Sequence, residues 1–272
     1  MTDSLLDTVM KGVTVFDLGR PMFPGMPQSV NHPRYTHNLP RRHGDIVRPD
    51  GGSSANDLLV TGTHVGTHID ALAHVSQDGR LYGDLDAIEE CVGGGYQTIG
   101  VHTIAPIVTR GVLLDIPRAL GVEVCEAAYE ITPACLEAAQ RRQDVSIGPD
   151  DVVLIRTGWG RRFAEGTESY LGTQSGVPGI SEAGAHWLGD LGITAAGADT
   201  IAFEWLSPGL SHSLLPAHRV LLVERGIYII EAMDLEALAD SGAGEFTFIL
   251  APLKLVGATG SPVRPLALVS YA

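Results

Sequence analysis

Three histidines and one aspartate occupy eleven consecutive positions of the sequence. The segment reads His64-Val65-Gly66-Thr67-His68-Ile69-Asp70-Ala71-Leu72-Ala73-His74. Imidazole nitrogens and carboxylate oxygens bind divalent metals, and imidazole also accepts and donates protons near neutral pH. The chemistry that this segment suggests is therefore metal-assisted hydrolysis or proton transfer.

The spacing within the segment predicts an extended chain. Side chains alternate between the two faces of a strand, so His64, His68 and Asp70 share one face. Gly66 leaves room between the two rings, and the Gly66-Thr67 pair disfavours a helix. A helix would also turn the aspartate away from the first histidine. We therefore predict that His64, His68 and Asp70 bind a divalent metal.

Two histidines and a carboxylate leave coordination positions open for water and substrate, and zinc, manganese and ferrous iron all accept this set. A bound metal lowers the pKa of its water toward ~7, which supplies hydroxide at neutral pH. His74 would lie on the same strand face as the three predicted ligands, but it follows Ala71-Leu72-Ala73, where the strand is free to bend. We expect His74 beside the metal as a general acid or base.

The same segment also admits two purely structural interpretations. The histidines could be residues that only form hydrogen bonds, although burying so many polar groups without partners is costly. The metal could also be structural, but structural zinc sites usually close with four protein ligands, often cysteines. Cys91, Cys125 and Cys135 all lie outside the segment. The spacing favours a catalytic metal site.

His212, His218 and Glu231 form a second candidate cluster. His218 falls in the first turn of a helix that Pro216 begins, and Glu231 follows the apolar stretch of residues 227–230. A carboxylate at a strand end, next to a helix that carries a histidine, could complete a metal shell. A solvated charge at the strand end is an equally good interpretation of Glu231.

Short apolar stretches bounded by Gly, Pro or Asp predict strands at residues 13–18, 111–116, 152–156, 227–230, 246–250 and 266–269. Capping residues predict three helices, which run from Pro133 to about Arg142, from Glu182 to Gly192 and from Pro216 to Gly226. Strands outnumber helices in an irregular order, which predicts an α/β fold with a mixed sheet. The length of 272 residues fits one domain over residues 1–272.

Two stretches have no regular pattern. Residues 20–57 contain six prolines, and residues 165–180 contain four glycines. The first is too long for an ordinary connection, so we expect a functional or packed loop there, and we expect both stretches to cover another part of the molecule.

The composition excludes several classes of partner. The 18 basic and 32 acidic residues give a formal net charge of −14. Nucleic acids and anionic membranes need a basic surface, so neither is expected as the main partner. Three scattered cysteines form no disulfide framework, and the first residues, MTDSLLDTVMKG, do not resemble a secretory signal. We expect a cytoplasmic protein.

The segment from His64 to His74 resembles the signature of the cyclase family of metal-dependent hydrolases, which includes bacterial kynurenine formamidases and isatin hydrolases. The family pattern is H-x-G-T-H-x-D-x-P-x-H, and HVGTHIDALAH departs from it only at Leu72. Further resemblance covers most of the chain, in the blocks FDLGRPMFPGMP, RGVLLDI, GPDDVVLIRTGWG, PGISEAGAHWL, GADTI and the stretch from HRVLL to GIYIIEAMDLEAL.

The resemblance implies roles for six residues. The family's metal ligands match the three predicted ones, and its catalytic histidine matches His74. His218 and Glu231 match the histidine and glutamate that help to bind metal in the formamidases, and we include both among the candidate catalytic residues. Leu72, which replaces the proline of the pattern, resembles the isatin hydrolase branch, for which a single manganese ion is expected.

The implied fold is a swivelling β/β/α domain with a barrel-like core and peripheral helices, assembled as a homodimer or homotetramer. The implied activity is hydrolysis of a non-peptide amide C–N bond, in an aryl formamide or an isatin-like lactam. Hydroxide on Mn²⁺ or Zn²⁺ would attack the carbonyl and His74 would move the proton. We expect residues 23–26 and Trp159 or Trp205 to pack the aromatic ring.

The sequence is compatible with further activities. A lactone hydrolase or a cyclase-dehydratase would use the same metal site. A ligand-binding metal protein without turnover is the alternative from outside the enzymes.

Overall fold

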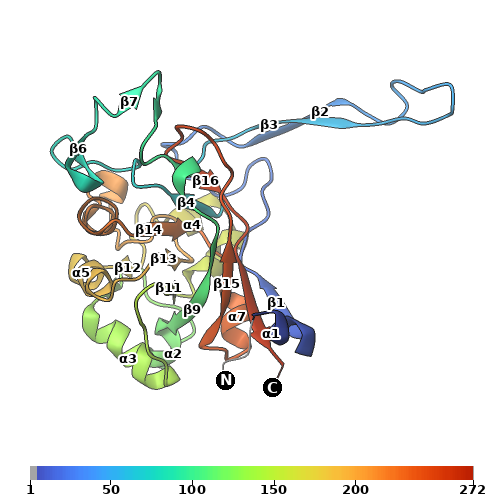
Figure 1. Cartoon of the computed structure of the whole chain (residues 1–272). Helices are drawn as coiled ribbons and strands as arrows, with labels where there is room; N and C mark the ends of the chain where they lie inside the picture. Colours follow the sequence, from blue (N-terminus) through green and yellow to red (C-terminus); the bar gives the residue numbers. More distant parts are fainter. Residues whose placement is uncertain (1–4, 272) are drawn as a thin grey trace.

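The computed structural model describes residues 5–271, and nine strands within these residues form one mixed sheet. In spatial order they are β1 (Val13–Asp17), β17 (Leu266–Ser270), β15 (Glu245–Leu250), β9 (Ile107–Asp115), β11 (Val152–Arg156), β13 (Ala195–Ala198), β14 (Tyr228–Glu231), β4 (His68–Asp70) and β16 (Gly260–Pro262). The central strands β9, β11, β13 and β14 run parallel, and antiparallel strands flank them on both sides. The sheet curls into a half-barrel surrounded by helices (Figure 1). This arrangement confirms the predicted α/β fold with a barrel-like core and peripheral helices.

The six predicted strands are all present, and β9 begins earlier than predicted, at Ile107. The central strands β11 and β13 are buried on both faces over their whole length, as parallel strands with covered faces usually are. In β11, Val153 and Ile155 pack against one hydrophobic core, whereas Val152 and Leu154 pack against a second core on the other face. The alternation of side chains along each strand produces this division.

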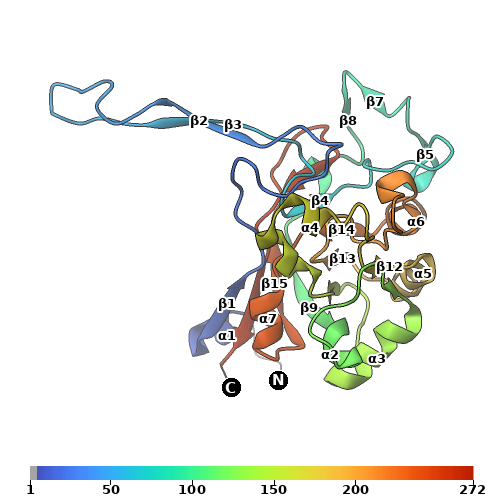
Figure 2. The ribbon, with the colours of Figure 1, turned by 180° about the vertical axis from the view of Figure 1, so that it is seen from behind.

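Helices cover one face of the sheet (Figures 1 and 2). They are α2 (Ile116–Leu120), α3 (Pro133–Gln143), α5 (Glu182–Asp190) and α6 (Pro216–His218), which continues as a π-helix over Arg219–Arg225. The three helices predicted from capping residues are confirmed. Ser181 caps α5, since its Oγ accepts a hydrogen bond from the backbone N–H of Gly184. Gly226, with φ of +68°, ends the segment that begins at Pro216.

The remaining elements are short. They are the helices α1 (Leu5–Lys11), α4 (Thr167–Leu171) and α7 (Glu236–Asp240), the 3₁₀ turns Tyr82–Asp84, Val101–Thr103, Trp159–Glu165 and Ser211–Ser213, and the strands β5 (Arg80–Leu81), β6 (Leu85–Asp86), β7 (Cys91–Val92), β8 (Gly95–Tyr96), β10 (Glu130–Ile131) and β12 (Gly179–Ile180). None of the helices in the described part of the chain combines the length and apolar character that a membrane span requires.

The two stretches without a regular sequence pattern, expected to be functional or packed loops, contain helices and strands, and Ser29, Asn31 and His32 of the first stretch line a cavity. Within the first, β2 (Thr36–Arg41) pairs with β3 (Asn56–Val60), and the two form an arm that projects from the body (Figure 2). We define this arm as residues 34–60. The second stretch contains α4 and β12, which a glycine-rich sequence does not predict. Tyr170 of α4 is fully buried, so packing of one aromatic side chain outweighs the weak local propensity.

Candidate metal centre

The six candidate site residues meet on the helix-covered face of β4 and β14. In the antiparallel register of these strands, Glu231 lies opposite His68, and Ile229 lies opposite Asp70. Ile229 packs against the core under the helices, so the side chains of all four residues point to that side. A cavity of about 170 Å³ opens there and is lined by Ser29, Asn31, His32, His64, His68, His74, Ile201, His212, Leu215, His218 and Glu231.

His64 lies in a turn, so the prediction of an extended chain from this residue onward is wrong. The strand β4 begins only at His68, and Gly66 before it has φ of +70°, a left-handed conformation that glycine adopts without strain. The turn nevertheless brings His64 to Asp70, with 2.6 Å between Nδ1 and Oδ1. Its other nitrogen, Nε2, lies 2.9 Å from Oγ1 of Thr259.

The ring of His68 is held by the same turn. Its Nδ1–H donates a hydrogen bond of 2.8 Å to the carbonyl oxygen of Gly66. The opposite nitrogen, Nε2, lies 3.5 Å from Oδ1 of Asp70 and 3.3 Å from Oε2 of Glu231. This nitrogen is therefore directed at two carboxylates and is available as a metal ligand.

Glu231 is buried, so the interpretation of this residue as a solvated strand-end charge is wrong. Because β14 pairs with β4 along its last residues, the end of the strand lies inside the molecule. His218 reaches the same point from α6, with Nε2 at 3.2 Å from Oε1 of Glu231 and 3.6 Å from Oδ2 of Asp70. The structure thus brings the two sequence clusters together.

His74 also reaches the cavity, through a turn that follows β4. Its backbone N–H donates a hydrogen bond to the carbonyl oxygen of Ala71, at 2.9 Å. The His74 ring stacks on the ring of His64 with 3.8 Å between centroids and an interplanar angle of 23°. Leu72, where the family pattern has proline, packs into the core under the helices. The turn therefore forms without the proline.

The donor set fits a divalent metal. Two groups of possible ligands have their donor atoms within 4.8 Å of one another, namely His64, Asp70 and His74, and His68, Asp70 and Glu231. Among the described residues, Oδ2 of Asp70 and Oε1 of Glu231 are buried atoms without a hydrogen-bond partner. Unpaired buried carboxylate oxygens are costly, and a cation between them would remove that cost.

The electrostatics of the cavity favour positive charge. Burial lowers the pKa of His68, but its bond to Glu231 and the charge of Asp70 outweigh burial and raise the pKa to about 9. Burial raises the pKa of Glu231, but its ion pairs with His218 and His68 lower it to about 2. Burial also raises the pKa of Asp70, but the neighbouring histidine rings hold it well below its ordinary value, so both carboxylates are ionised at neutral pH and attract cations.

His74 differs from the other rings. Burial lowers its pKa to about 4, and the positive charges of neighbouring rings act in the same direction. The ring is therefore neutral at pH 7 and has a nitrogen that can accept a proton.

Several residues at the site were not predicted. Glu204 contacts His218 on the side away from the cavity. The sequence did hold a signal for this residue, because a single charge within the apolar stretch Ile201–Leu206 indicates a buried carboxylate with a partner. The ring of His32 stacks on the ring of His64 with 5.5 Å between the ring centroids. No local sequence pattern predicts this contact.

The expected ring-packing residues do not line the metal cavity, although Gly25 and Met26 line a second cavity beside it. None of residues 23–26, Trp159 and Trp205 is among the described residues that line the metal cavity. Trp159 is buried and donates its indole N–H to Tyr170, while Trp205 donates to Ala128. Ile201 and Leu215 form the apolar part of the wall instead.

Residues 16–205 match the family described as putative cyclase. The chain belongs to this family. Isatin hydrolase from Roseibium aggregatum is 26% identical over 266 residues, which cover 96% of this chain and 93% of that protein. Kynurenine formamidase from Salinibacter ruber is 28% identical over 218 residues, which cover 80% and 82%. These cyclase-family relatives confirm the predicted enzyme class, a hydrolase.

The fold comparison agrees with the family assignment. A crystal structure described as a novel cyclase superimposes with a TM-score of 0.83 at 28% identity, over 94% of this chain and 87% of that chain. The match to cyclase-like protein 3 from Oryza sativa covers about two thirds of the length of that protein.

Proposed function

We propose that this cyclase-family chain is a metal-dependent hydrolase of amide C–N bonds, with residues 1–272 acting as one domain. The observation that supports this most is the pair of buried carboxylates, Asp70 and Glu231. Each turns one oxygen to Nε2 of His68 and the other to Nε2 of His218, and the oxygens on the His218 side have no hydrogen-bond partner among the described residues. Two ionised carboxylates at such a site call for a cation.

His64, His68 and Asp70 would hold the metal, with Glu231 and His218 on the side of the second oxygen of Asp70. When bound, Zn²⁺ or Mn²⁺ polarises a carbonyl and makes a water molecule more acidic. Both metals accept nitrogen and carboxylate ligands, and we propose one of the two as the cofactor.

His74 moves the proton in this proposal. Its neutral ring lies on the cavity wall, where it accepts a proton from the water that attacks the amide carbonyl. The ring then donates that proton to the nitrogen as the C–N bond breaks. The carbonyl carbon gains the hydroxyl of water and the nitrogen gains the proton, so the products are a carboxylic acid and an amine.

We propose an aryl formamide or an isatin-like cyclic amide as the substrate, as the names of the relatives suggest. A second cavity of about 520 Å³ shares Ser29 and His32 with the metal cavity and is also lined by Met26 and Tyr35. An aromatic ring fits this wider space while its carbonyl lies at the metal cavity.

The test uses protein stripped by a chelator and reloaded with Zn²⁺ or Mn²⁺. We expect either metal to restore hydrolysis of an aryl formamide or of a lactam, assayed beside a lactone of the same ring size. Turnover of the lactone alone would identify a lactone hydrolase. Full metal loading without turnover of any of the three would point to a ligand-binding protein and contradict the proposal.

Two variants separate the proposed roles. Asp70→Asn is expected to lose metal and activity together, because Asp70 belongs to both possible ligand groups. His74→Ala is expected to keep the metal and to lower kcat by about 100- to 10,000-fold. Metal content by mass spectrometry and kcat are measured together, with His186→Ala on α5 as the control. Loss of metal from His74→Ala would contradict its role as a proton carrier.

The three cysteines are free, which is in keeping with the cytoplasmic location that we propose.

We also propose that two copies of the chain pair through the arm. Leu58 and Leu59 of the arm are 55% and 54% exposed, and an isolated two-stranded hairpin is only marginally stable in water. The arm carries four arginines and three aspartates, a net charge of +1, whereas the rest of the chain carries −15. An arm of this charge is attracted to the acidic body of a second copy.

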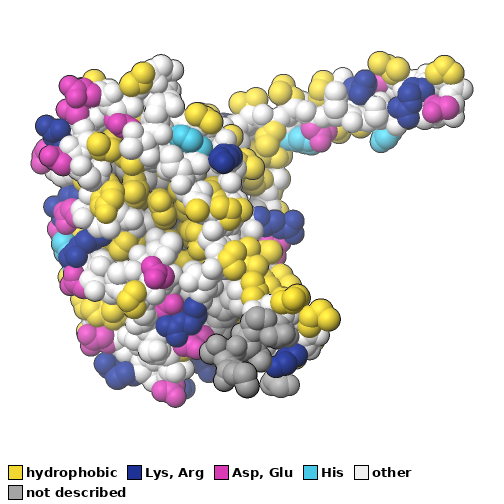
Figure 3. Space-filling model, in the orientation of Figure 1, with side chains coloured by type: hydrophobic (Ala, Val, Ile, Leu, Met, Phe, Trp, Pro, Cys, Tyr) yellow, Lys and Arg dark blue, Asp and Glu magenta, His cyan; other side chains and the backbone are white. Residues whose placement is uncertain are grey.

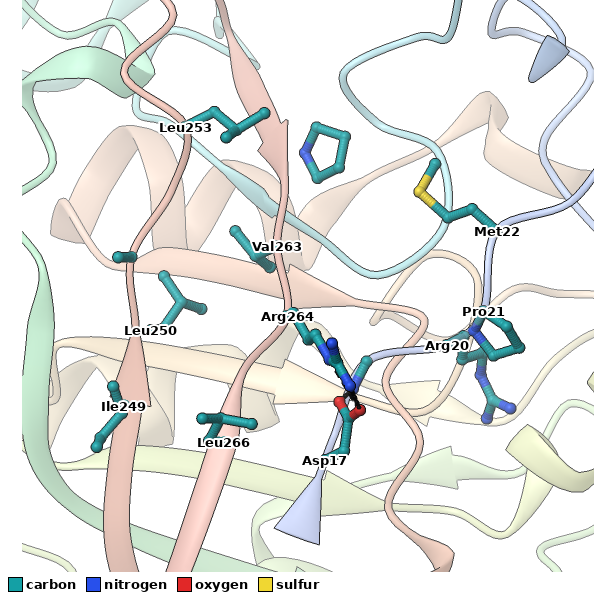
Figure 4. Close-up of a pocket in the computed structure, with 13 residues that line it drawn as sticks. Asp17, Arg20, Pro21, Met22, Ile249, Leu250, Leu253, Val263, Arg264 and Leu266 are labelled. Carbon is teal, nitrogen blue, oxygen red and sulfur yellow. Dashed lines mark hydrogen bonds and ion pairs between the residues drawn. The ribbon is translucent and has the colours of Figure 1, made fainter. Parts of the chain in front are cut away.

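The body offers a receiving surface. Beneath the projecting arm the molecule is hollowed, and hydrophobic side chains gather along the inner edge of the hollow (Figure 3). A groove of about 730 Å³ is lined by Met22, Leu253, Val263 and Leu266, among others, with the Arg264–Asp17 ion pair beside them (Figure 4). Because each copy has both an arm and a groove, a two-fold axis would cover both at once.

A further inference from the structure

Glu204 is a fully buried carboxylate that contacts His218 on the side away from the metal cavity. Its Oε1 lies 2.6 Å from Nδ1 of His218 and also accepts a hydrogen bond of 3.1 Å from the backbone N–H of the same residue. Its Oε2 accepts a third hydrogen bond, of 3.1 Å, from the backbone N–H of Ala217. One carboxylate therefore holds both the imidazole ring and the first turn of its helix.

These contacts decide which nitrogen of His218 faces the cavity. An ionised carboxylate only accepts hydrogen bonds, so Nδ1 of His218 must carry a proton. The other nitrogen, Nε2, is then directed at Oδ2 of Asp70 and Oε1 of Glu231, the two oxygens that lack hydrogen-bond partners among the described residues. A ring rotated or shifted away from Glu204 would not present Nε2 to these oxygens.

The backbone that carries Glu204 is held in an unusual conformation. Phe203, which precedes it, is fully buried and has φ of +57°, a left-handed conformation that is unfavourable for a bulky side chain. A Cβ on Gly179 would lie 2.2 Å from the carbonyl group of Glu204, so the two backbones approach as closely as glycine permits. Strain of this kind persists where the surrounding structure fixes it, and it is common at functional sites.

We infer that Glu204 is a positioning residue, which fixes the tautomer and the orientation of His218 so that Nε2 faces the metal centre. This inference rests on the proposed metal site and adds a residue that touches neither metal nor substrate. Partners of this type orient histidine ligands, and their loss typically weakens metal binding by roughly 10- to 100-fold.

The experiment titrates the full chain, freed of metal, with Co²⁺ and follows its visible absorption. Glu204→Gln places an amide NH₂ against one of three N–H donors, so we expect Co²⁺ affinity to fall by about 10- to 100-fold. Asp199→Asn is the matched control, because Asp199 is equally buried but accepts its hydrogen bonds from Thr157 and Gly158. The control is expected to keep its Co²⁺ affinity while it loses thermal stability.

A second readout reports the ring itself. Nitrogen NMR shifts of His218 are expected to show a protonated Nδ1 in the wild type and a changed tautomer in Glu204→Leu, which removes the acceptor of the Nδ1 proton altogether. If Glu204→Gln does not fold, Glu204→Asp keeps the charge but withdraws the oxygens from the ring, and it should weaken Co²⁺ binding as well.

The outcomes separate this inference from the proposed function. Unchanged Co²⁺ affinity and an unchanged His218 tautomer in a folded Glu204 variant would overturn the positioning role alone. A wild-type chain that binds no Co²⁺ would overturn the metal site and, with it, the positioning role.

Discussion

At the scale of single residues, the site is defined by which nitrogen of each ring is already bonded. A backbone carbonyl fixes His68 and a buried carboxylate fixes His218, each through Nδ1. In both rings Nε2 is left facing Asp70 and Glu231. The protein thus orients its candidate ligands with groups that take no part in the proposed reaction.

A glycine beside the site gives a prediction at this scale. Gly260 of β16 lies opposite Asp70, and a Cβ there would be 2.5 Å from Cε1 of His64 and 2.9 Å from the carbonyl oxygen of Ile69. Gly260→Ala should therefore displace the His64 ring from Asp70 and weaken metal binding by about 10-fold or more. The dissociation constant for Co²⁺ measures the effect.

Gly148→Ala is the control for this substitution, because the nearest side-chain atom to its Cβ would lie at 3.6 Å, an ordinary contact distance. Equal Co²⁺ affinity in both alanine variants would show that the His64 position does not matter for the metal.

At the scale of elements, a network of ion pairs, buried between the strands and partly exposed at Glu236, joins the sheet to α7. Arg156 at the end of β11 donates to Asp115 at the end of β9, with 2.8 Å between Nη1 and Oδ1. The same guanidinium makes two hydrogen bonds to Glu236 of α7, at 2.9 and 2.8 Å, and Arg161 adds another at 2.5 Å. This network closes the carboxyl ends of two parallel strands under a helix.

The network predicts a pH dependence of stability. Burial raises the pKa of Glu236, but the bonds from Arg156 and Arg161 outweigh burial and hold the pKa below its ordinary value. The ionised Glu236 therefore stabilises the fold above a pH of about 4.5, and this contribution is lost as the pH falls through the lower, folded-state pKa.

We expect Glu236→Gln to lower the free energy of unfolding by about 1–3 kcal/mol at pH 7 and by much less once the pH lies below the folded-state pKa of Glu236. Denaturant unfolding at the two pH values measures this difference. Glu245→Gln, which alters the exposed pair with Arg110, should cost less than about 0.5 kcal/mol. A cost for Glu236→Gln that stays constant from pH 7 to pH 3 would contradict this role of the ionised carboxylate.

At the scale of the whole molecule, the arm is the feature whose stability the contacts within a single chain do not explain. Its strands expose apolar side chains on a hairpin that projects from the body (Figures 1 and 2). The segment that leads into the arm also contributes Ser29 and His32 to the metal cavity. Contact of the arm with a second copy would therefore stabilise the part of the metal cavity that these two residues line.

Shortening the arm tests the proposed pairing. Asn38 lies opposite Leu58, so a two-residue Asn-Gly turn can replace residues 39–57 without changing the register of the remaining pair. We expect light scattering after gel filtration to give twice the chain mass for the wild type and the single mass for the shortened chain. A monomeric wild type, or a shortened chain that still dimerises, would refute pairing through the arm. A cooperative thermal unfolding transition confirms that the shortened chain is folded.

Local sequence was sufficient for the features that depend on neighbours along the chain. The starts of α3, α5 and α6 follow from Pro133, Ser181 and Pro216, because capping and proline act within one helical turn. The grouping of His64, His68 and Asp70 also follows from their spacing, although the turn at Gly66 replaces the predicted strand. A glycine between two polar rings signals such a turn as readily as it signals a strand.

Contacts between distant segments were decided by the tertiary structure alone. Glu231 became a buried partner of His68 because β14 pairs with β4, and Glu204 reached His218 because a strained turn places it beside α6. The arm could not be predicted from the sequence for the same reason. Its strands pair across a long loop, and they bury no apolar face that would give them a periodic pattern. The spacing of residues predicts which side chains of one segment lie together. The free energy of burying a charge depends instead on the partner that another segment of the fold supplies.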